Sequence, residues 1–170
     1  LYEQSNLARE VFQEAGDTLG MDMAALCFEG PEETLRLTEN TQPAILTVSI
    51  AAWRVFQQEM ELRPEVLAGH SLGEYAALVV SGALAFKDAV YAVKQRGKFM
   101  QEAVPVNVGA MAAILGLEDN AVREVCETAS EGQIVEPANF NSDGQVVISG
   151  HREAVGRASA LAREKGAKKV

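Results

Sequence analysis

Residues 64–80 of this chain read Pro64-Glu65-Val66-Leu67-Ala68-Gly69-His70-Ser71-Leu72-Gly73-Glu74-Tyr75-Ala76-Ala77-Leu78-Val79-Val80. The apolar run that ends at Gly69 predicts a short buried strand, and helical composition resumes directly at Glu74. Between them stands a Gly-x-Ser-x-Gly pattern, which is typical of a sharp strand-to-helix turn that exposes a nucleophilic serine. This stretch therefore predicts an α/β fold that presents Ser71 at the end of a strand.

The residues around Ser71 supply what such a turn needs. Glycine at positions 69 and 73 removes the Cβ atoms that would collide with the neighbouring strand and helix, while Ser71 itself takes a strained backbone conformation. The N–H of Leu72 lies at a helix N-terminus, where it can stabilise a developing oxyanion. The alternative is a tight glycine turn whose serine only caps the helix. We predict Ser71 as a nucleophile and the Leu72 N–H as an oxyanion donor.

The chain contains two histidines, and neither is placed to be the catalytic base. His70 is adjacent to Ser71, so its side chain projects in another direction, and we expect it beneath the turn in a packing or hydrogen-bonding role. His151 opens an amphipathic helix after Gly150, which favours a cap or surface role. A serine hydroxyl without a base is a weak nucleophile. We therefore expect the catalytic histidine to lie outside this sequence and these 170 residues alone to be inactive.

Composition indicates a soluble globular protein. The chain has 170 residues, of which 48% are hydrophobic and 23% charged, so it can bury a core. No stretch is apolar enough to span a membrane, and the net charge of −9 argues against nucleic acid as a partner. Cys27 and Cys126 form no metal-ligand spacing, so we expect reduced packing residues and no metal site. Without a basic and then apolar leader, a cytoplasmic protein is expected.

Helical periodicity organises the chain up to Ala103. It predicts a short acidic helix after Pro31 and longer helices over residues 4–19, 44–59 and 88–103. Thr41 is expected to be the N-cap of the helix over 44–59, with Pro43 in its first turn. That helix is apolar on most faces, which indicates burial in a large core.

After Pro105 the pattern changes to alternating strands and helices. Strands are predicted over residues 108–117, 134–139 and 145–149, and helices over 119–129 and 151–165. Asp143-Gly144 between the last two strands is a hairpin signal, and residues 167–170 look like the start of another strand. This βαββα order with a beginning β is the split βαβ, ferredoxin-like arrangement, missing most of its last strand.

Short motifs run in order along essentially the whole chain. They are Asn40-Thr41-Gln42-Pro43-Ala44-Ile45-Leu46, Gly69-His70-Ser71-Leu72-Gly73-Glu74-Tyr75-Ala76-Ala77-Leu78, Gln95-Arg96-Gly97, Met100-Gln101-Glu102-Ala103, Ala138-Asn139-Phe140-Asn141-Ser142 and Gly144-Gln145-Val146-Val147-Ile148-Ser149-Gly150. Together they resemble the acyltransferase family of fatty acid and polyketide synthesis, and they look most like its stand-alone bacterial malonyl transacylases. The combination is far more specific than the serine motif alone.

The resemblance implies both a fold and a reaction. Residues 1–106 would be part of a hydrolase-like parallel-sheet core, here incomplete, and residues 107–170 an inserted ferredoxin-like α+β subdomain, truncated at its last strand. The enzyme would transfer a malonyl group from malonyl-CoA, through an ester on Ser71, to the phosphopantetheine thiol of acyl carrier protein in fatty acid biosynthesis. Coenzyme A thioester is then a substrate, no cofactor is bound permanently, and the protein is a monomer.

The resemblance also assigns roles to residues. Arg96 matches the arginine that grips the malonyl carboxylate, to which a guanidinium offers two parallel donors. Asn139 and Asn141 match positions that line the pantetheine path, although bonds to their own turn backbone are an equal alternative. Gln42 is assigned to the same substrate-binding site, with helix capping as the competing role. The family's glycine-rich first strand and its histidine motif are missing here, so a fragment lacking both ends is expected.

Two alternatives stay open. A serine esterase, lipase or thioesterase of the α/β-hydrolase type uses the same turn but has no use for Arg96. A non-catalytic interpretation treats the chain as an inactive fragment. A further tension concerns the implied partner, because acyl carrier proteins are acidic and this chain carries a net charge of −9. Docking would have to use a local basic patch rather than the overall field.

Overall fold

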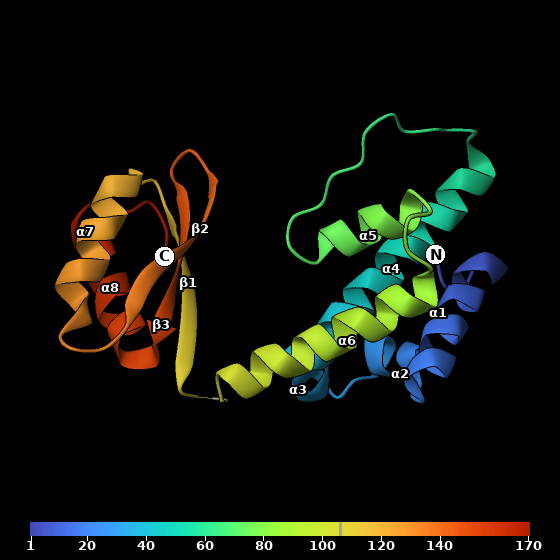
Figure 1. The fold of residues 1–170 in the computed structure, drawn as a ribbon, viewed down its shortest axis with the longest axis horizontal. Coiled ribbons are helices and arrows are strands. Elements are labelled where there is room, and N and C mark those ends of the chain that lie inside the picture. The colour runs from blue at the N-terminus through green and yellow to red at the C-terminus, as the bar shows by residue number, and fades with distance from the viewer. Residues whose placement is uncertain (106) are drawn as a thin grey trace. The chain divides into compact units, whose positions relative to one another are not determined.

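The structure, a computed structural model, describes residues 1–105 and 107–170. The described residues form two compact units, Leu1–Ala103 and Val104–Val170 (Figure 1), and each unit has its own hydrophobic core. The predicted domain boundary falls at Val106, which lies outside the described residues. A division after residue 106 therefore stays a prediction.

The first unit consists of helices, as its periodicity predicts. They are α1 (Asn6–Leu19), α2 (Met23–Phe28), α3 (Glu32–Leu35), α4 (Thr38–Glu59), α5 (Gly73–Val80) and α6 (Phe86–Ala103). Helix α1 begins after the N-cap Ser5, whose hydroxyl accepts a hydrogen bond from the Ala8 N–H, and it ends at Gly20, which has a φ of 66°. The helices predicted over 4–19 and 88–103 are confirmed to within one turn at each end.

Helix α4 differs from its prediction at its start. It begins at Thr38, several residues earlier than expected, with Leu37 as the N-cap, so Thr41 and Pro43 both lie inside the helix. The Thr41 hydroxyl donates to the backbone carbonyls of Leu35 and Leu37 instead of capping an N-terminus. A threonine shortly before a proline is a common helix start. Here the contact with α3 favours a longer helix.

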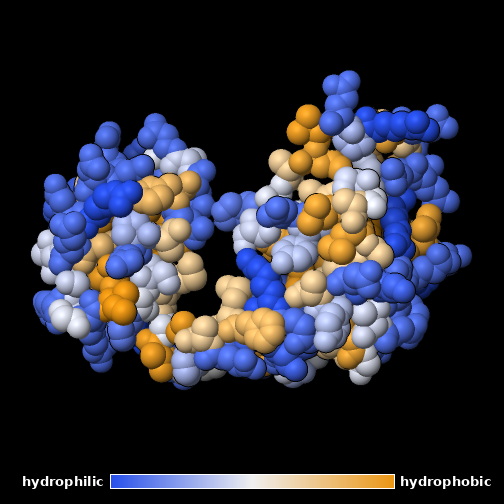
Figure 2. Space-filling model, in the orientation of Figure 1, coloured by the Kyte–Doolittle hydropathy of each residue, from blue (hydrophilic) through white to orange (hydrophobic). Residues whose placement is uncertain are grey.

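The core of the first unit lies between α1, α4 and α6. Its largest fully buried apolar side chains come from these helices and from α2, and include Val11, Met23, Leu46, Ile50, Val90 and Val93. The predicted burial of α4 in the core is confirmed for the face that carries Leu46 and Ile50 but is wrong for another face, where Ile45, Val48 and Phe56 are 51%, 48% and 39% exposed. Helices α1, α5 and α6 cover the other faces of α4. Apolar side chains are accordingly visible on the surface of this unit (Figure 2).

The second unit is a three-stranded antiparallel sheet with two helices packed on it (Figure 1). Its elements are β1 (Gly109–Leu115), α7 (Asp119–Ser130), β2 (Val135–Ser142), β3 (Gln145–His151) and α8 (Arg152–Glu164), and the strand order is β1-β3-β2. The predicted hairpin is confirmed, since Asp143 and Gly144 join β2 to β3 and Gly144 has a φ of 69°. Lys169 forms a single antiparallel bridge with Leu115, where the start of a further strand is predicted.

No strand forms immediately before Ser71, although a buried strand is predicted there. Residues 60–69 form neither helix nor strand, and Val66 within them is 83% exposed. A strand needs a neighbour to complete its backbone hydrogen bonds, and the paired strands of the described residues are antiparallel and belong to the second unit. The apolar sequence indicates burial, but burial depends on a partner strand.

Both cysteines are free thiols. Cys27 is partly buried, and Cys126 is buried in the second core. Burial, followed by the carboxylates of Glu136 and Glu127, raises the pKa of the Cys126 thiol to about 11, so this thiol is protonated at neutral pH and serves packing. In the residues that the structure describes, no helix is long and apolar enough to cross a membrane, and no cluster of His, Cys, Asp or Glu is arranged to hold a metal ion.

Candidate active site

Ser71 occupies a sharp turn directly before α5. It has a positive φ of 53°, a conformation that costs a non-glycine residue on the order of 1–3 kcal/mol and persists only where its surroundings impose it. Two hydrogen bonds close the turn, from the Gly73 N–H to the His70 carbonyl at 2.9 Å and from the Glu74 N–H to the Ser71 carbonyl at 3.2 Å. The strained backbone predicted for Ser71 is therefore confirmed.

This turn requires glycine at position 69. A Cβ there would lie 2.0 Å from the carbonyl carbon of Gly73 and 2.4 Å from the nitrogen of Glu74, which are backbone atoms at the start of α5. The matching prediction for Gly73 is wrong for the described residues, because a Cβ at that position meets no atom within 4 Å. The collision expected there needs a neighbouring strand, and that strand does not form.

The backbone N–H of Leu72 is available at the start of α5. Leu72 is the N-cap residue of this helix, and among the residues described its N–H donates no hydrogen bond. The Ser71 hydroxyl does not cap the helix either, since α5 has no side-chain capping bond. The alternative of a serine that only caps the helix is therefore wrong. In the described residues the turn therefore presents the Ser71 hydroxyl beside a backbone N–H that forms no hydrogen bond, and a free N–H at a helix start is the kind of donor that can stabilise an oxyanion.

Arg96 and Gln42 reach the turn from α6 and α4. The Nη2 of Arg96 donates to Ser71 Oγ at 2.8 Å, and its Nη1 donates to the side-chain oxygen of Gln42. Ser71 is exposed, Arg96 is half-buried, and Gln42 is only 6% exposed. A guanidinium at this distance favours negative charge on Oγ and keeps further N–H groups for a carboxylate. Three predicted site residues, distant in sequence, thus lie together.

The close approach of α6 to the start of α4 positions Arg96. Gly97 faces the α4 backbone, where a Cβ would lie only 2.4 Å from the Cα of Glu39. Lys94 holds the same contact, with its Nζ 2.8 Å from Asn40 Oδ1 and 3.3 Å from a carboxylate oxygen of Glu39. This role of Gly97 is not among the predictions from the sequence. The available signal was a glycine inside a helical pattern, next to Arg96.

We expect Gly97→Ala to destabilise the protein, although alanine is the better helix former. Its methyl group would push α6 away from the α4 backbone and lower the free energy of unfolding by about 1–3 kcal/mol. Gly156→Ala is the matched control, because Gly156 lies in α8 with nothing within 4 Å of its Cβ position. That change should stabilise by up to about 1 kcal/mol. Chemical denaturation of a full-length protein carrying this sequence measures both, and equal effects would contradict the close approach.

Neither histidine forms a hydrogen bond with Ser71 in the described part of the chain. His70 is exposed, so its predicted place beneath the turn is wrong, because no strand packs there to cover it. His151 is the N-cap residue of α8, and its Nδ1 accepts a hydrogen bond from the Ile134 N–H at 2.9 Å. This agrees with the predicted cap-region role. The partner of the Ser71 hydroxyl is Arg96, a donor that cannot take its proton.

Asn139 and Asn141 lie on β2 and belong to the second unit. Asn139 is partly buried and pairs with Val147 of β3, whereas Asn141 is exposed. Within the described ranges, neither side chain forms a hydrogen bond, so a bond to their own turn backbone is not seen. Their part in binding a substrate stays a prediction.

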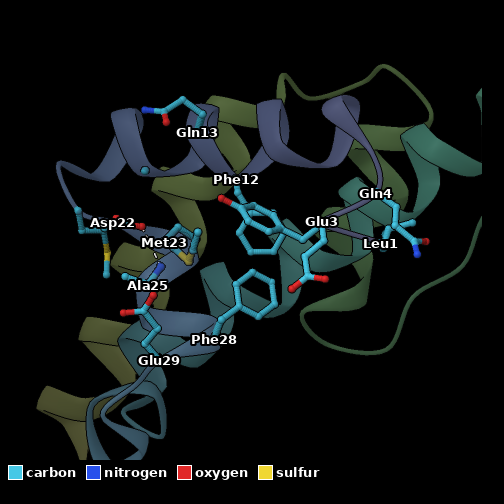
Figure 3. A pocket seen from close by; sticks show the side chains of 14 residues that line it. Leu1, Glu3, Gln4, Phe12, Gln13, Asp22, Met23, Ala25, Phe28 and Glu29 are labelled. Carbon is cyan, nitrogen blue, oxygen red and sulfur yellow. Dashed lines mark hydrogen bonds between the residues drawn. The ribbon is translucent and has the colours of Figure 1, made fainter.

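A pocket of about 820 Å³ opens between α1, α2 and the residues before α1. Figure 3 shows the rings of Phe12 and Phe28 facing into it, and none of the predicted site residues lines it. Another pocket, of about 810 Å³, is lined by residues on both sides of the turn, among them Gly69 and Glu74. The second pocket therefore borders the segment that carries Ser71, and the first is unrelated to it.

Known proteins resemble this chain over its whole length. Residues 1–170 match the family model described as the acyl transferase domain. The chain is 56% identical over 164 residues to the malonyl CoA-acyl carrier protein transacylase of Escherichia coli (strain K12), which covers 96% of this chain and 53% of that protein. It is 53% identical over 171 residues to the protein of the same name from Bacillus subtilis (strain 168), with 100% and 54% covered.

The solved structures that are similar to this chain include malonyl transacylases as well. The malonyl CoA-acyl carrier protein transacylase of Coxiella burnetii matches with a TM-score of 0.91 at 51% identity, covering 98% of this chain and 52% of that chain. A malonyl-transacylase in complex with a type II PKS acyl-carrier protein matches with a TM-score of 0.91 at 49% identity, covering 99% and 54%. The chain spans about half the length of these relatives. Because the family model covers every residue, the chain belongs to the acyl transferase domain family.

Proposed function

We propose that a protein containing this chain transfers a malonyl group from malonyl-CoA to the phosphopantetheine thiol of acyl carrier protein, in fatty acid biosynthesis. The observation that carries the proposal is the 2.8 Å hydrogen bond from Arg96 Nη2 to the hydroxyl of Ser71, at a strained turn. It joins a candidate nucleophile to a cation that suits a carboxylate-bearing acyl group. The activity named for the relatives supports the same conclusion.

The reaction would consist of two transfers through Ser71. In the first, Oγ attacks the thioester carbonyl carbon, the C–O bond forms, the C–S bond breaks, and coenzyme A leaves as a thiol with the proton that the serine loses. In the second, the pantetheine thiol attacks the ester carbonyl carbon, a C–S bond forms, the C–O bond to Ser71 breaks, and the serine oxygen takes up the proton that the thiol loses. The Leu72 N–H donates to the carbonyl oxygen while that oxygen is negative. The base that moves the proton is expected outside these 170 residues.

Arg96 would make the site selective for malonyl groups. Once malonyl is attached to Ser71 Oγ, its free carboxylate lies only a few bonds from the oxygen that the guanidinium already contacts. The guanidinium offers that carboxylate two parallel donors, whereas an uncharged acyl group leaves those donors unpaired. An esterase or lipase has no need of this cation. The contact therefore favours the transacylase over the hydrolase alternative.

We further propose that residues 1–106 belong to a hydrolase-like core and residues 107–170 to a ferredoxin-like subdomain. The order β1-β3-β2 supports the subdomain, because Lys169 bridges the free edge of β1, where a fourth strand would complete the split βαβ sheet. The exposed apolar segment before Ser71 supports the core, since partner strands would bury it. On β2, Asn139 and Asn141 are proposed to line the pantetheine path.

The proposal includes the setting of the reaction. Malonyl-CoA and acyl carrier protein are the partners, coenzyme A thioester is a substrate rather than a bound cofactor, and the protein acts as a cytoplasmic monomer. The relative solved with an acyl-carrier protein supports the macromolecular partner. Because this chain carries a net charge of −9, docking of an acidic carrier would use a local basic patch.

Intact mass spectrometry tests the proposal. A full-length protein carrying this sequence, incubated with malonyl-CoA, should gain the mass of one malonyl group and pass it to the carrier thiol when holo acyl carrier protein is added. Residues 1–170 alone should gain no mass, because neither of the two histidines forms a hydrogen bond with Ser71 in the described residues and we propose that the base lies elsewhere. Release to water in preference to the carrier would favour the esterase alternative. A full-length protein that forms no adduct would refute the proposal.

A further inference from the structure

We propose that Met100 and Gln42 form a positioning pair that holds Arg96 against Ser71, so that the sulfur of Met100 contributes to the preference for malonyl. This inference rests on the proposed function. It gives Gln42 a different role from the one that the family resemblance implies. Instead of binding substrate, Gln42 would orient the arginine that does.

Protein groups occupy both ends of the Gln42 side chain. Its oxygen accepts from Arg96 Nη1, and its Nε2 lies 3.4 Å from the sulfur of Met100. Gln42 is 6% exposed, and in the described residues no buried side-chain nitrogen or oxygen lacks a hydrogen-bond partner. A buried amide that is paired at both ends has little left to offer a substrate. Its influence on the site therefore passes through Arg96.

The two partners allow one orientation of the amide. A guanidinium only donates, so it requires the amide oxygen, and a thioether sulfur only accepts, so it requires the amide NH2. If the amide turned over, its NH2 would face the N–H groups of Arg96 and its oxygen would face the sulfur of Met100. Both hydrogen bonds would then be lost, and the amide of Gln42, which is only 6% exposed, would be left without these partners. Met100 thus favours the orientation in which Gln42 holds Arg96.

The contacts form a continuous line from Met100 to Ser71. Met100 and Arg96 are one helical turn apart on α6, so both reach the same side chain of α4. With Nη1 held by Gln42, the planar guanidinium loses freedom to rotate, and Nη2 stays directed at Ser71 Oγ. An acyl group attached to that oxygen would meet an arginine that is already oriented. Because the arginine is oriented beforehand, binding of the acyl carboxylate costs less conformational entropy.

Met100→Leu tests whether the hydrogen bond accepted by the Met100 sulfur matters. Leucine has a similar volume and also favours helices, but it accepts no hydrogen bond. In a full-length protein carrying this sequence, we expect the ratio of kcat/KM for malonyl over acetyl transfer to fall about fivefold, with acetyl transfer nearly unchanged. Met60→Leu is the control, since Met60 is 55% exposed at the end of α4 and should leave the ratio as it is. An unchanged ratio in Met100→Leu would overturn the proposal.

A double-mutant cycle separates action through Gln42 from direct contact between Met100 and the substrate. Gln42→Leu should lower the malonyl-to-acetyl ratio further than Met100→Leu does, and Met100→Leu should add nothing in that background. Losses that add up across the two changes would overturn the positioning role, because they would mean that Met100 acts independently of Gln42.

A measurement that does not depend on enzyme activity distinguishes an error in the positioning pair of Met100 and Gln42 from an error in the proposed function. The NMR resonances of the Gln42 side-chain amide should shift in Met100→Leu and stay in place in Met60→Leu. If they stay in place in both, the positioning pair is refuted even where malonyl transfer is observed. If the wild-type protein forms no malonyl adduct but the resonances shift as expected, the pair exists and the proposed function is wrong.

Discussion

Ser71→Ala should remove on the order of 10⁶ of the malonyl-transfer rate of a full-length protein carrying this sequence. The hydroxyl is the atom that forms the ester, and its neighbours cannot replace it. Leu72 offers only a backbone N–H, and the guanidinium of Arg96 donates hydrogen bonds but accepts none, so it is not a nucleophile. Steady-state transfer to holo acyl carrier protein measures the loss of turnover, and intact mass after incubation with malonyl-CoA measures the loss of the adduct.

The control for this prediction keeps the turn in place. Alanine at position 71 keeps a Cβ at the same φ of 53°, so the free energy of unfolding should stay close to the wild-type value. Ser81→Ala is a matched change at the end of α5, because Ser81 is an exposed C-cap serine whose hydroxyl, in the described residues, bonds only to nearby backbone, donating to the Leu78 carbonyl and accepting from the Ala83 N–H. Its turnover should stay within about twofold of wild type. An adduct that survives Ser71→Ala would show that another residue is acylated.

Arg96→Ala should lower kcat/KM for malonyl transfer roughly 10²–10³-fold, through the loss of two charge-assisted hydrogen bonds to the substrate carboxylate. Acetyl transfer should fall by less than about tenfold, since acetyl has no carboxylate and loses only the contact between Arg96 and Ser71 Oγ. Arg96→Lys should fall between wild type and alanine, because an ammonium keeps the charge but not the parallel donors. Parallel kinetics with malonyl-CoA and acetyl-CoA measure the ratio.

Two outcomes would argue against this role for Arg96. Equal losses for malonyl and acetyl would identify a structural residue that supports the turn through Ser71. A similar malonyl-specific loss in Arg36→Ala would point to an effect of net charge on substrate approach. Arg36 is a suitable comparison because its side chain is 76% exposed and pairs only with Glu32 in the described residues. We expect that variant to behave as wild type.

Local features of the fold could be predicted well because they depend on neighbouring residues. The positive φ of Ser71, the need for glycine at 69 and the hairpin at Asp143-Gly144 all follow from backbone sterics within a few residues. The end of α1 at Gly20 has the same origin, since glycine readily adopts the left-handed conformation that ends a helix.

Features that depend on a distant partner could not be predicted in the same way. The apolar segment before Ser71 has strand composition, yet no strand pairs with it in the described residues, and the expected collision at Gly73 is absent for that reason. The start of α4 was misplaced because the contact between Thr41 and α3 outweighs the cap and proline pattern. The exposed face of α4 is a third case, since its apolar sequence does not specify what covers it.

The sequence by itself determined that this chain carries a serine on a sharp turn before a helix, an arginine on the next helix and an antiparallel βαββα unit. Periodicity and turn chemistry are local properties, and they can be read one segment at a time. Only the tertiary structure decided that Arg96 lies between Gln42 and Ser71, and that Met100 completes the set. Those contacts exist because Gly97 has no side chain, so α6 can approach the backbone of α4 closely. The spacing between two helices depends on both of them, and it cannot be read from the sequence of either helix alone.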